Sequence, residues 1–197
     1  MNASDDTISH DMVLGQRIKR LRLGRAWTLE QLSQFSGLAR STLSKIENGQ
    51  MSPTYDALLK LAGGLQMDLG ALFAPQAAPA QAGRRSVNRS GDGLAHSTPH
   101  YEHVLLCNEL SQKDMIPFKS QVVARSFDEF EDWSRHDGEE FVYVLSGEVT
   151  LYTEFYEPTL LAAGDSWYID SRLGHRVISR SAEDAQVLWV STTNPRT

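Results

Sequence analysis

The sequence of 197 residues has a single cysteine and no long apolar run. One cysteine cannot form an internal disulfide, and Cys107 lies in the apolar stretch VLLCNEL, which is typical of a buried strand. No run of about 18 apolar residues occurs. The acidic start MNASDDTISHDM lacks the basic and apolar parts of a signal peptide. We therefore expect a soluble, cytoplasmic protein with no membrane partner.

The chain also lacks an overall basic excess, which a DNA-binding protein usually has. Its net charge is −6, but this charge is unevenly distributed. Residues 12–74 carry a net +4 and residues 75–99 a net +2, whereas residues 1–11 carry −3 and residues 100–197 carry −9. Charge of opposite sign in two parts of one chain indicates two modules that meet different partners.

Composition divides the chain in the same way. Residues 75–99 are rich in proline, glycine and polar residues and have no periodicity, so we predict a linker there and a disordered acidic tail over residues 1–11. Apolar residues at helical spacing over residues 12–74 predict about five short helices. Residues 100–197 hold eight short runs rich in aromatic and β-branched residues, the first two being HVLLCNEL and QVVARSF, which predict an all-β barrel or sandwich.

Capping signals locate two adjacent helices in the first module. Thr28 and Gln31 have the spacing of a capping box, which predicts a helix over residues 29–36 that ends at Gly37. A second helix over residues 40–47 follows after only three residues. Two helices joined by a tight glycine-containing turn form a helix-turn-helix.

The second of these helices has one apolar and one polar face. Leu43 and Ile46 should pack inward. The opposite face carries side chains that could donate hydrogen bonds to base edges in a DNA major groove: Arg40, Ser41, Ser44 and Lys45. The alternative is a helical bundle whose basic face touches no DNA.

The stretch from Leu14 to Phe73 resembles, over its whole length, the DNA-binding domain of the phage-repressor (Xre) family of transcriptional regulators. The resemblance implies that the base-reading helix carries Arg40, Ser41, Ser44 and Lys45. It implies that phosphate contacts come from Thr42, Asn48 and Arg17. Ala39 departs from the family, because it replaces the usual Ser or Thr cap, and Phe35 stands where the family tends to be polar. A domain of this size is expected to bind a palindromic operator as a homodimer.

Potential metal ligands occur in the second module. If the chain between His136 and Glu140 is extended, the side chains of these two residues point to the same side. His175 stands just before another predicted strand. Two histidines and one carboxylate form a facial triad suited to Fe(II) and accessible to Zn, Ni or Mn. The alternatives are a hydrogen-bonded polar cluster without metal, or direct contact with an organic ligand.

Residues from about 100 to 193 resemble the cupin family, whose fold is a double-stranded β-helix barrel. The resemblance rests on two motifs, which contain His136, Glu140 and Gly147 and then Gly164, Asp165 and His175. The usual first histidine is Ser134 here, so the resemblance implies three ligands instead of four, and Asp170 replaces a customary proline. Among the basic side chains, Arg125, Arg172 and Arg176 could clamp a carboxylate, whereas the acidic run FDEFEDWSRHDGEE would favour a cation. The charge of the ligand is left open by the sequence.

The two modules together predict a sequence-specific DNA-binding transcriptional regulator that is controlled by a small metabolite bound in the cupin barrel. Regulators of this kind are usually repressors, so we expect a repressor. The alternative is a mononuclear-metal cupin enzyme, because mononuclear-iron epoxidases have a similar two-part layout and a similar HxxxE arrangement. A third possibility is a constitutive DNA-binding protein with an inert, dimerising barrel. Intact donors on the second helix favour regulation over catalysis.

Overall fold

The computed structural model describes residues 3–67, 69–73, 85–110 and 113–192. They form two compact units. The first consists of the chain up to Val87 together with residues 108–113, and the second consists of residues 88–107 and those from 114 onward. Residues 75–84 of the predicted linker lie outside the described residues, and residues 88–99 belong to the second unit. That part differs from the predicted linker because it contains strand β1, which pairs along its whole length with the next strand.

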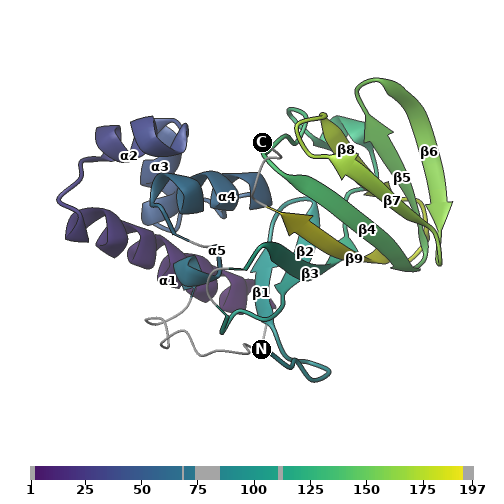
Figure 1. Cartoon of the computed structure of the whole chain (residues 1–197), viewed down its shortest axis with the longest axis horizontal. Helices are drawn as coiled ribbons and strands as arrows, with labels where there is room; N and C mark the ends of the chain where they lie inside the picture. Colours follow the sequence, from purple (N-terminus) through teal and green to yellow (C-terminus); the bar gives the residue numbers. More distant parts are fainter. Residues whose placement is uncertain (1–2, 68, 74–84, 111–112, 193–197) are drawn as a thin grey trace. The chain divides into compact units, whose positions relative to one another are not determined.

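The regular elements described in the first unit are all helices, as the sequence predicts (Figure 1). Its elements are α1 (Ala3–Gly24), α2 (Leu29–Ser36), α3 (Arg40–Glu47), α4 (Tyr55–Gly64) and α5 (Leu69–Phe73). One fully buried side chain from each helix illustrates the core: Ile18, Leu32, Leu43, Leu58 and Leu72. None of the described helices is long and apolar enough to span a membrane.

The first helix begins earlier than the sequence indicates. α1 starts at Ala3, whereas we predict a disordered tail over residues 1–11, of which residues 1–2 lie outside the described part. Once a helix is nucleated, each added residue gains a backbone hydrogen bond, so a polar segment continues a helix that the apolar pattern starts further along.

The helix-turn-helix has the predicted boundaries. The Thr28 hydroxyl accepts a hydrogen bond from the Gln31 amide, and the Gln31 side chain accepts one from the Thr28 amide, which is the expected capping box. α2 ends at Gly37, whose φ of 70° is left-handed. α3 begins after Ala39, which supplies no side-chain cap, so this helix start lacks a bond that is typically worth about 1 kcal/mol.

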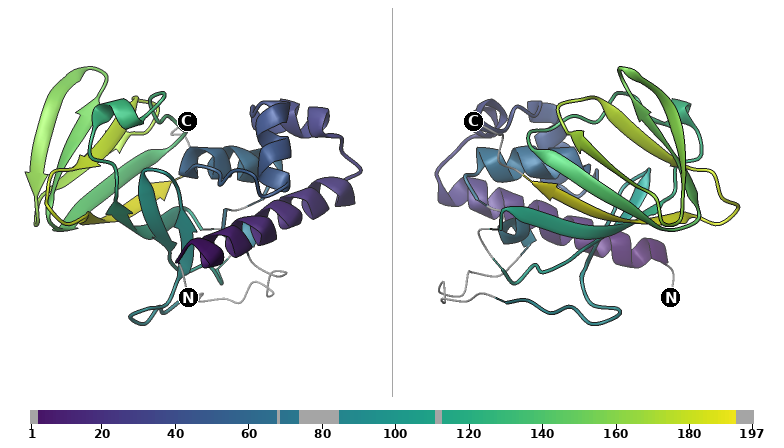
Figure 2. Two further views of the ribbon diagram at one scale, coloured as in Figure 1. Left: turned by 180° about the vertical axis from the view of Figure 1, so that it is seen from behind. Right: turned by 45° about the vertical axis from the view of Figure 1, so that its right-hand side comes forward.

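The second unit is a barrel of two curved sheets (Figure 2). Its described strands are β1 (Leu94–Ser97), β2 (Tyr101–Leu105), β3 (Met115–Val122), β4 (Glu139–Ser146), β5 (Glu148–Thr153), β6 (Tyr156–Ala162), β7 (Ser166–Asp170), β8 (His175–Ser179) and β9 (Ala185–Thr192). One sheet has the order β1-β2-β3-β9-β4-β7 and the other β6-β5-β8, with antiparallel pairing throughout.

The prediction of a strand in the run QVVARSF is mostly wrong. β3 covers Met115–Val122, so only its last two residues fall in that run. Pro117 hid this strand in the sequence, because proline cannot donate to a sheet. Pro117 is tolerated in β3 because β2 pairs with β3 only from Phe118 onward.

The barrel interior follows the alternation of its strands. On β4, Glu140, Val142 and Val144 are buried, and the two residues between them are exposed. Gly138 begins the approach to this strand with a φ of +99°, and a Cβ there would lie 1.9 Å from the Thr192 carbonyl oxygen. Only glycine fits this position, which brings the chain from His136 close against β9.

Candidate functional site

The polar face of α3 is open, as the sequence predicts. Leu43 and Ile46 are buried in the helical core. On the outer side, Arg40, Ser41, Lys45 and Asn48 are exposed, and Thr42 and Ser44 are half-buried. Among the residues that the structure describes, these side chains form a single salt bridge, the 3.9 Å pair of Arg40 with Glu30, in which both side chains are mostly exposed. Such a pair contributes little to stability, so it does not hold Arg40 back from another anion.

A buried ion pair, not foreseen in the sequence, fixes α3 on α1. Arg22 Nε and Nη2 donate to the two carboxylate oxygens of Glu47 at 2.7 and 2.8 Å, and Arg22 Nη1 donates to the Trp27 carbonyl at 2.8 Å. The hydrogen bond to Glu47 raises the pKa of Arg22. The sequence did indicate that Glu47 would be buried, because this residue follows Leu43 by four positions and so lies on the same, buried face of α3.

Two other residues of the helical unit have partners within that unit. Arg17 Nη2 donates to the Ala71 carbonyl at 2.9 Å, and burial lowers the pKa of this arginine. The Arg17 side chain therefore ties α1 to α5, and the structure does not bring it to the face of α3. Phe35, which is about half exposed, packs against Trp27 with ring centroids 4.5 Å apart.

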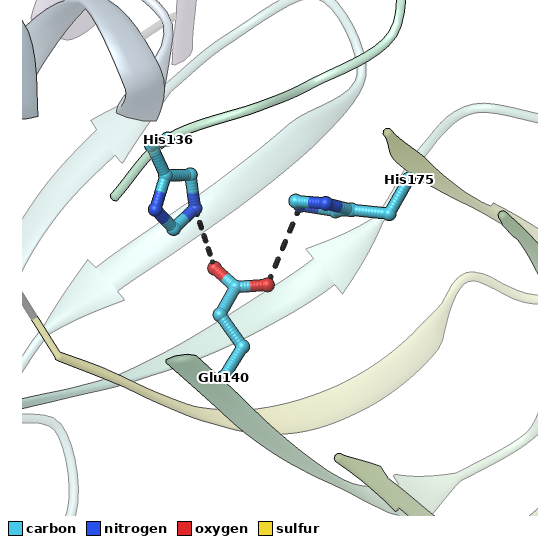
Figure 3. A group of neighbouring side chains, drawn as sticks. All are labelled: His136, Glu140 and His175. Atoms are coloured by element: carbon cyan, nitrogen blue, oxygen red, sulfur yellow. Dashed lines mark hydrogen bonds and ion pairs between the residues drawn. The ribbon is translucent and has the colours of Figure 1, made fainter. Parts of the chain in front are cut away.

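In the barrel, His136, Glu140 and His175 converge as predicted (Figure 3). His136 Nε2 lies 2.9 Å from Glu140 Oε1, and His175 Nε2 lies 3.4 Å from Glu140 Oε2. One potential ligand atom of each residue lies within 4.8 Å of those of the other two, and all three side chains are buried. This is a compact set of two nitrogens and one carboxylate.

The second ring nitrogen of each histidine shows how the imidazoles are protonated. His136 Nδ1 is 3.0 Å from the Asp137 carbonyl oxygen, and His175 Nδ1 is 2.9 Å from the Leu173 carbonyl oxygen. A carbonyl can only accept, so each Nδ1 carries a hydrogen. Each Nε2 atom, which faces Glu140, then either carries a second proton of the imidazole or binds a cation that it shares with the Glu140 carboxylate. Tethering of Nδ1 by backbone carbonyls is the usual support for histidines that bind metal through Nε2, so these residues fit a divalent metal ion.

Glu140 is held as a carboxylate. Its burial favours the neutral acid, but the charge of His175, the hydrogen bond from His136 and that residue's charge outweigh burial and lower the pKa of Glu140 to about 2. The Ser191 hydroxyl also donates to Glu140 Oε1 at 2.9 Å. The cluster therefore presents an ionised oxygen ligand, as metal coordination requires.

Backbone hydrogen bonds set the segment before Glu140 in place. Ser134 and His175 exchange amide-to-carbonyl hydrogen bonds at 3.2 and 3.1 Å, and the His136 amide donates to the Ser171 carbonyl at 3.0 Å. Ser134 thus lies directly beside His175, at the position where the cupin resemblance implies a further histidine.

The arginines proposed as ligand clamps have partners elsewhere. Arg176 alternates with His175 along β8; its guanidinium donates to the Phe127 and Asp132 carbonyls and lies 4.4 Å from the centre of the Phe127 ring. Arg125 donates to the turn before β9, where Asp184 is its salt-bridge partner. Arg172 is paired with Asp170 in the same way. The structure does not bring these guanidiniums to the Glu140 cluster.

Two interior residues, Tyr101 and His103, were not identified as site residues from the sequence. Tyr101 donates to the Val177 carbonyl at 3.1 Å, and burial raises its pKa. His103 contacts the Ser120 hydroxyl at 2.7 Å, and burial, with the nearby charge of His96, lowers the pKa of His103 to about 3. Alternation along β2 places Tyr101 and His103 on one face, and this signal was available in the sequence.

Known protein families match both units. Residues 18–72 match the family model described as helix-turn-helix, and residues 128–191 match the one described as cupin domain. The HTH-type transcriptional regulator SutR of Escherichia coli (strain K12) is 34% identical over 62 residues, which make up 32% of this chain and 35% of SutR. The chain therefore spans about a third of that relative.

Solved structures share the two-part layout. A structure described as an HTH_3 family transcriptional regulator from Vibrio cholerae has a TM-score of 0.66 and 20% identity, covering 96% of this chain and 99% of its own. Hydroxypropylphosphonic acid epoxidase from S. wedmorenis has a TM-score of 0.50 and 20% identity, covering 92% of this chain and 97% of its own. At these identities the likeness shows the fold alone.

Proposed function

We propose that this chain, which joins an Xre-type helix-turn-helix domain to a cupin domain, is a sequence-specific transcriptional regulator, acting in the cytoplasm as a repressor. The observation that carries the proposal is the solvent-exposed polar face of α3, the second helix of the helix-turn-helix. Arg40, Ser41 and Lys45 are exposed there, while Leu43 and Ile46 anchor the helix from below. Side chains of these types can read base edges when such a helix enters a major groove.

The proposed DNA contacts divide into two classes. Base contacts come from Arg40, Ser41, Ser44 and Lys45. Thr42 and Asn48 are proposed to bind phosphate, as the family resemblance implies. Asn48 Nδ2 is 3.5 Å from Ser44 Oγ, so these two polar groups lie together at the end of α3. Arg17 is proposed for a phosphate contact only if it leaves the Ala71 carbonyl, which makes it the weakest member of the set.

The barrel is proposed to bind the effector, with a divalent metal ion held by His136, Glu140 and His175. When bound, the ion would supply a Lewis-acidic centre for a ligand oxygen. An effector changes DNA binding only if its affinity differs between the DNA-competent and incompetent states of the protein. Arg125 and Arg176 are proposed to act indirectly. Arg125 holds the turn before β9 through Asp184, and Arg176 holds the segment that contains Phe127 and Asp132.

A homodimer is proposed through the outer face of β4 and β7. Phe141, Tyr143, Leu145 and Tyr168 are each at least 39% exposed there, and Phe141 is directly opposite Tyr168. A two-fold operator needs two DNA-binding heads, and one apolar patch that meets its own copy about a two-fold axis provides them. Phe141→Glu should convert the dimer to a monomer in light scattering. Leu160→Glu, which changes an exposed leucine on β6, should not.

DNA retention tests the proposal directly. Purified full-length protein should retard fragments of the DNA upstream of its own gene in a gel-shift assay, and this binding should weaken steeply as salt rises. Lys45→Ala should abolish retention at moderate salt. Lys60→Ala is the matched control, because it removes a lysine of α4 that pairs with Asp56. Failure of the wild-type chain to retard any such fragment at low salt contradicts the proposal.

An oxygen-dependent cupin enzyme is the second candidate, and the triad of His136, Glu140 and His175 is the observation in its favour. Two histidines and a carboxylate leave coordination positions open for substrate and an oxygen species. Metal analysis of freshly purified protein, with His136→Ala as the control, separates the two functions. Stoichiometric iron together with oxygen consumption in the presence of a small acid would support the enzyme. A chain that retards DNA and consumes no oxygen would exclude it.

A further inference from the structure

Three neighbouring strands form one inner wall of the barrel around Glu140. Register places Ser191 of β9 and Ile169 of β7 on either side of Glu140. Two residues further along β4, Val142 lies between Trp189 and Trp167 in the same way. Because side chains alternate across a sheet, these residues all face the interior.

This wall contains hydrogen-bond donors that the protein leaves without an acceptor. Within the part of the chain that the structure describes, Trp167 Nε1 and Ser171 Oγ are buried and have no hydrogen-bond partner. Ser171 continues the alternation of β7 and is fully buried. Trp189 is different, because its indole N–H interacts with the Glu140 carboxylate and helps to lower the pKa of that group. A buried donor without an acceptor is destabilising, so two such donors on one wall call for an acceptor from outside the chain.

We propose that the effector is a small organic acid, whose oxyanion binds beside Glu140 and accepts hydrogen bonds from Trp167 and Ser171. The acid would supply the oxygen acceptors that the wall lacks. The two indole rings, which meet edge to face at a centroid distance of 5.9 Å, and the Phe118 ring stacked on Trp189 favour an apolar carbon skeleton.

Charge points the same way. A divalent ion held by two neutral imidazoles and the Glu140 carboxylate would have a net charge of +1, which one oxyanion would neutralise. A cationic effector would place a second positive charge beside it in a buried site, where unpaired charge is costly. The basic side chains that could otherwise clamp an acid, Arg125, Arg172 and Arg176, are engaged elsewhere. The Trp167 indole and the Ser171 hydroxyl therefore take the place of a guanidinium as the donors of this site.

Calorimetric titration of the full-length chain, with and without Zn²⁺, tests the inference. The probes are benzoate, hexanoate and phenylphosphonate, with benzyl alcohol and benzylamine as neutral and cationic counterparts. We expect at least one acid to bind and both counterparts to fail. Because a hydrogen bond to a charged group is worth about 1.5–3 kcal/mol, Trp167→Phe and Ser171→Ala should each weaken the acid about tenfold to a hundredfold.

Matched controls separate the site from general damage to the barrel. Ser166→Ala removes an exposed hydroxyl from the same strand, and Trp133→Phe changes an indole that packs on Arg176 instead of the wall. Both should bind the acid as the wild type does. If no acid binds, if benzylamine binds as tightly as benzoate, or if the wall variants bind like the controls, the inference is overturned.

The inference rests on the proposed effector-binding role of the barrel, and the two fail in different ways. Each variant is therefore also tested for DNA retention without any acid. A chain that retards DNA but binds no acid overturns only the inference. A chain that binds acid but retards no DNA leaves the site standing and removes the regulatory function.

Discussion

Breaking the buried pair of Arg22 and Glu47 should destabilise the helical unit far more than breaking a surface pair. Both Arg22 and Glu47 side chains are at least nine-tenths buried, and two short hydrogen bonds join them. Glu47→Met leaves the Arg22 charge buried without its partner. Removing one member of a buried pair typically costs about 3–5 kcal/mol, because the remaining charge has lost both water and its counter-ion.

The double replacement shows whether the loss comes from the unpaired charge. Replacing both Arg22 and Glu47 by Met removes both charges, and such apolar replacements are often neutral or stabilising, so most of the lost stability should return. Lys60→Met, which breaks the partly exposed pair with Asp56, should cost less than about 1 kcal/mol. Urea unfolding followed by the far-UV circular dichroism of the helices measures all three variants. A loss below about 1 kcal/mol for Glu47→Met would refute this reasoning.

Three further predictions concern the barrel and the α3 cap. Ser134→His should add a fourth ligand, the third nitrogen of the set, beside His175 and tighten Zn²⁺ binding by about tenfold or more, as measured by competition with a chelator. Because the pKa of His103 is lowered to about 3, an unfolded chain takes up a proton there at higher pH than the folded chain. The resulting stability is complete above the ordinary histidine value of about 6.5 and is lost as pH falls toward 3. His103→Gln should therefore flatten the decline of unfolding free energy across that interval. Ala39→Ser should supply the missing α3 cap and stabilise the helical unit by about 1 kcal/mol in the same urea assay, and an unchanged midpoint would count against a cap at residue 39.

The helix-turn-helix was predictable to the residue because its signals are local. The capping box of Thr28 and the left-handed Gly37 act within a few residues of themselves. The two helix boundaries that they bracket therefore agree with the structure. The Arg22–Glu47 pair was missed because it joins side chains 25 positions apart, and nothing local indicates which arginine a buried glutamate will meet.

The barrel was predictable in kind but less so in detail. His136, Glu140 and His175 converge because motif spacing and strand alternation agree. β3 was misplaced because Pro117 obscured its pattern. The position of the Trp167 and Trp189 indoles on the same inner wall as Glu140 could not be predicted from the sequence. It depends on the register between strands that are distant in the sequence.

Selection from a pool of random duplex DNA by the purified full-length chain tests whether α3 reads a DNA sequence. We expect enrichment of an inverted repeat whose half-sites lie about one helical turn, or a multiple of it, apart. We also expect Arg40→Ala to relax the preference at one position in each half-site. Bound DNA with no enriched sequence, or the same motif from the wild type and Arg40→Ala, would contradict the assignment of α3 as the helix that reads DNA.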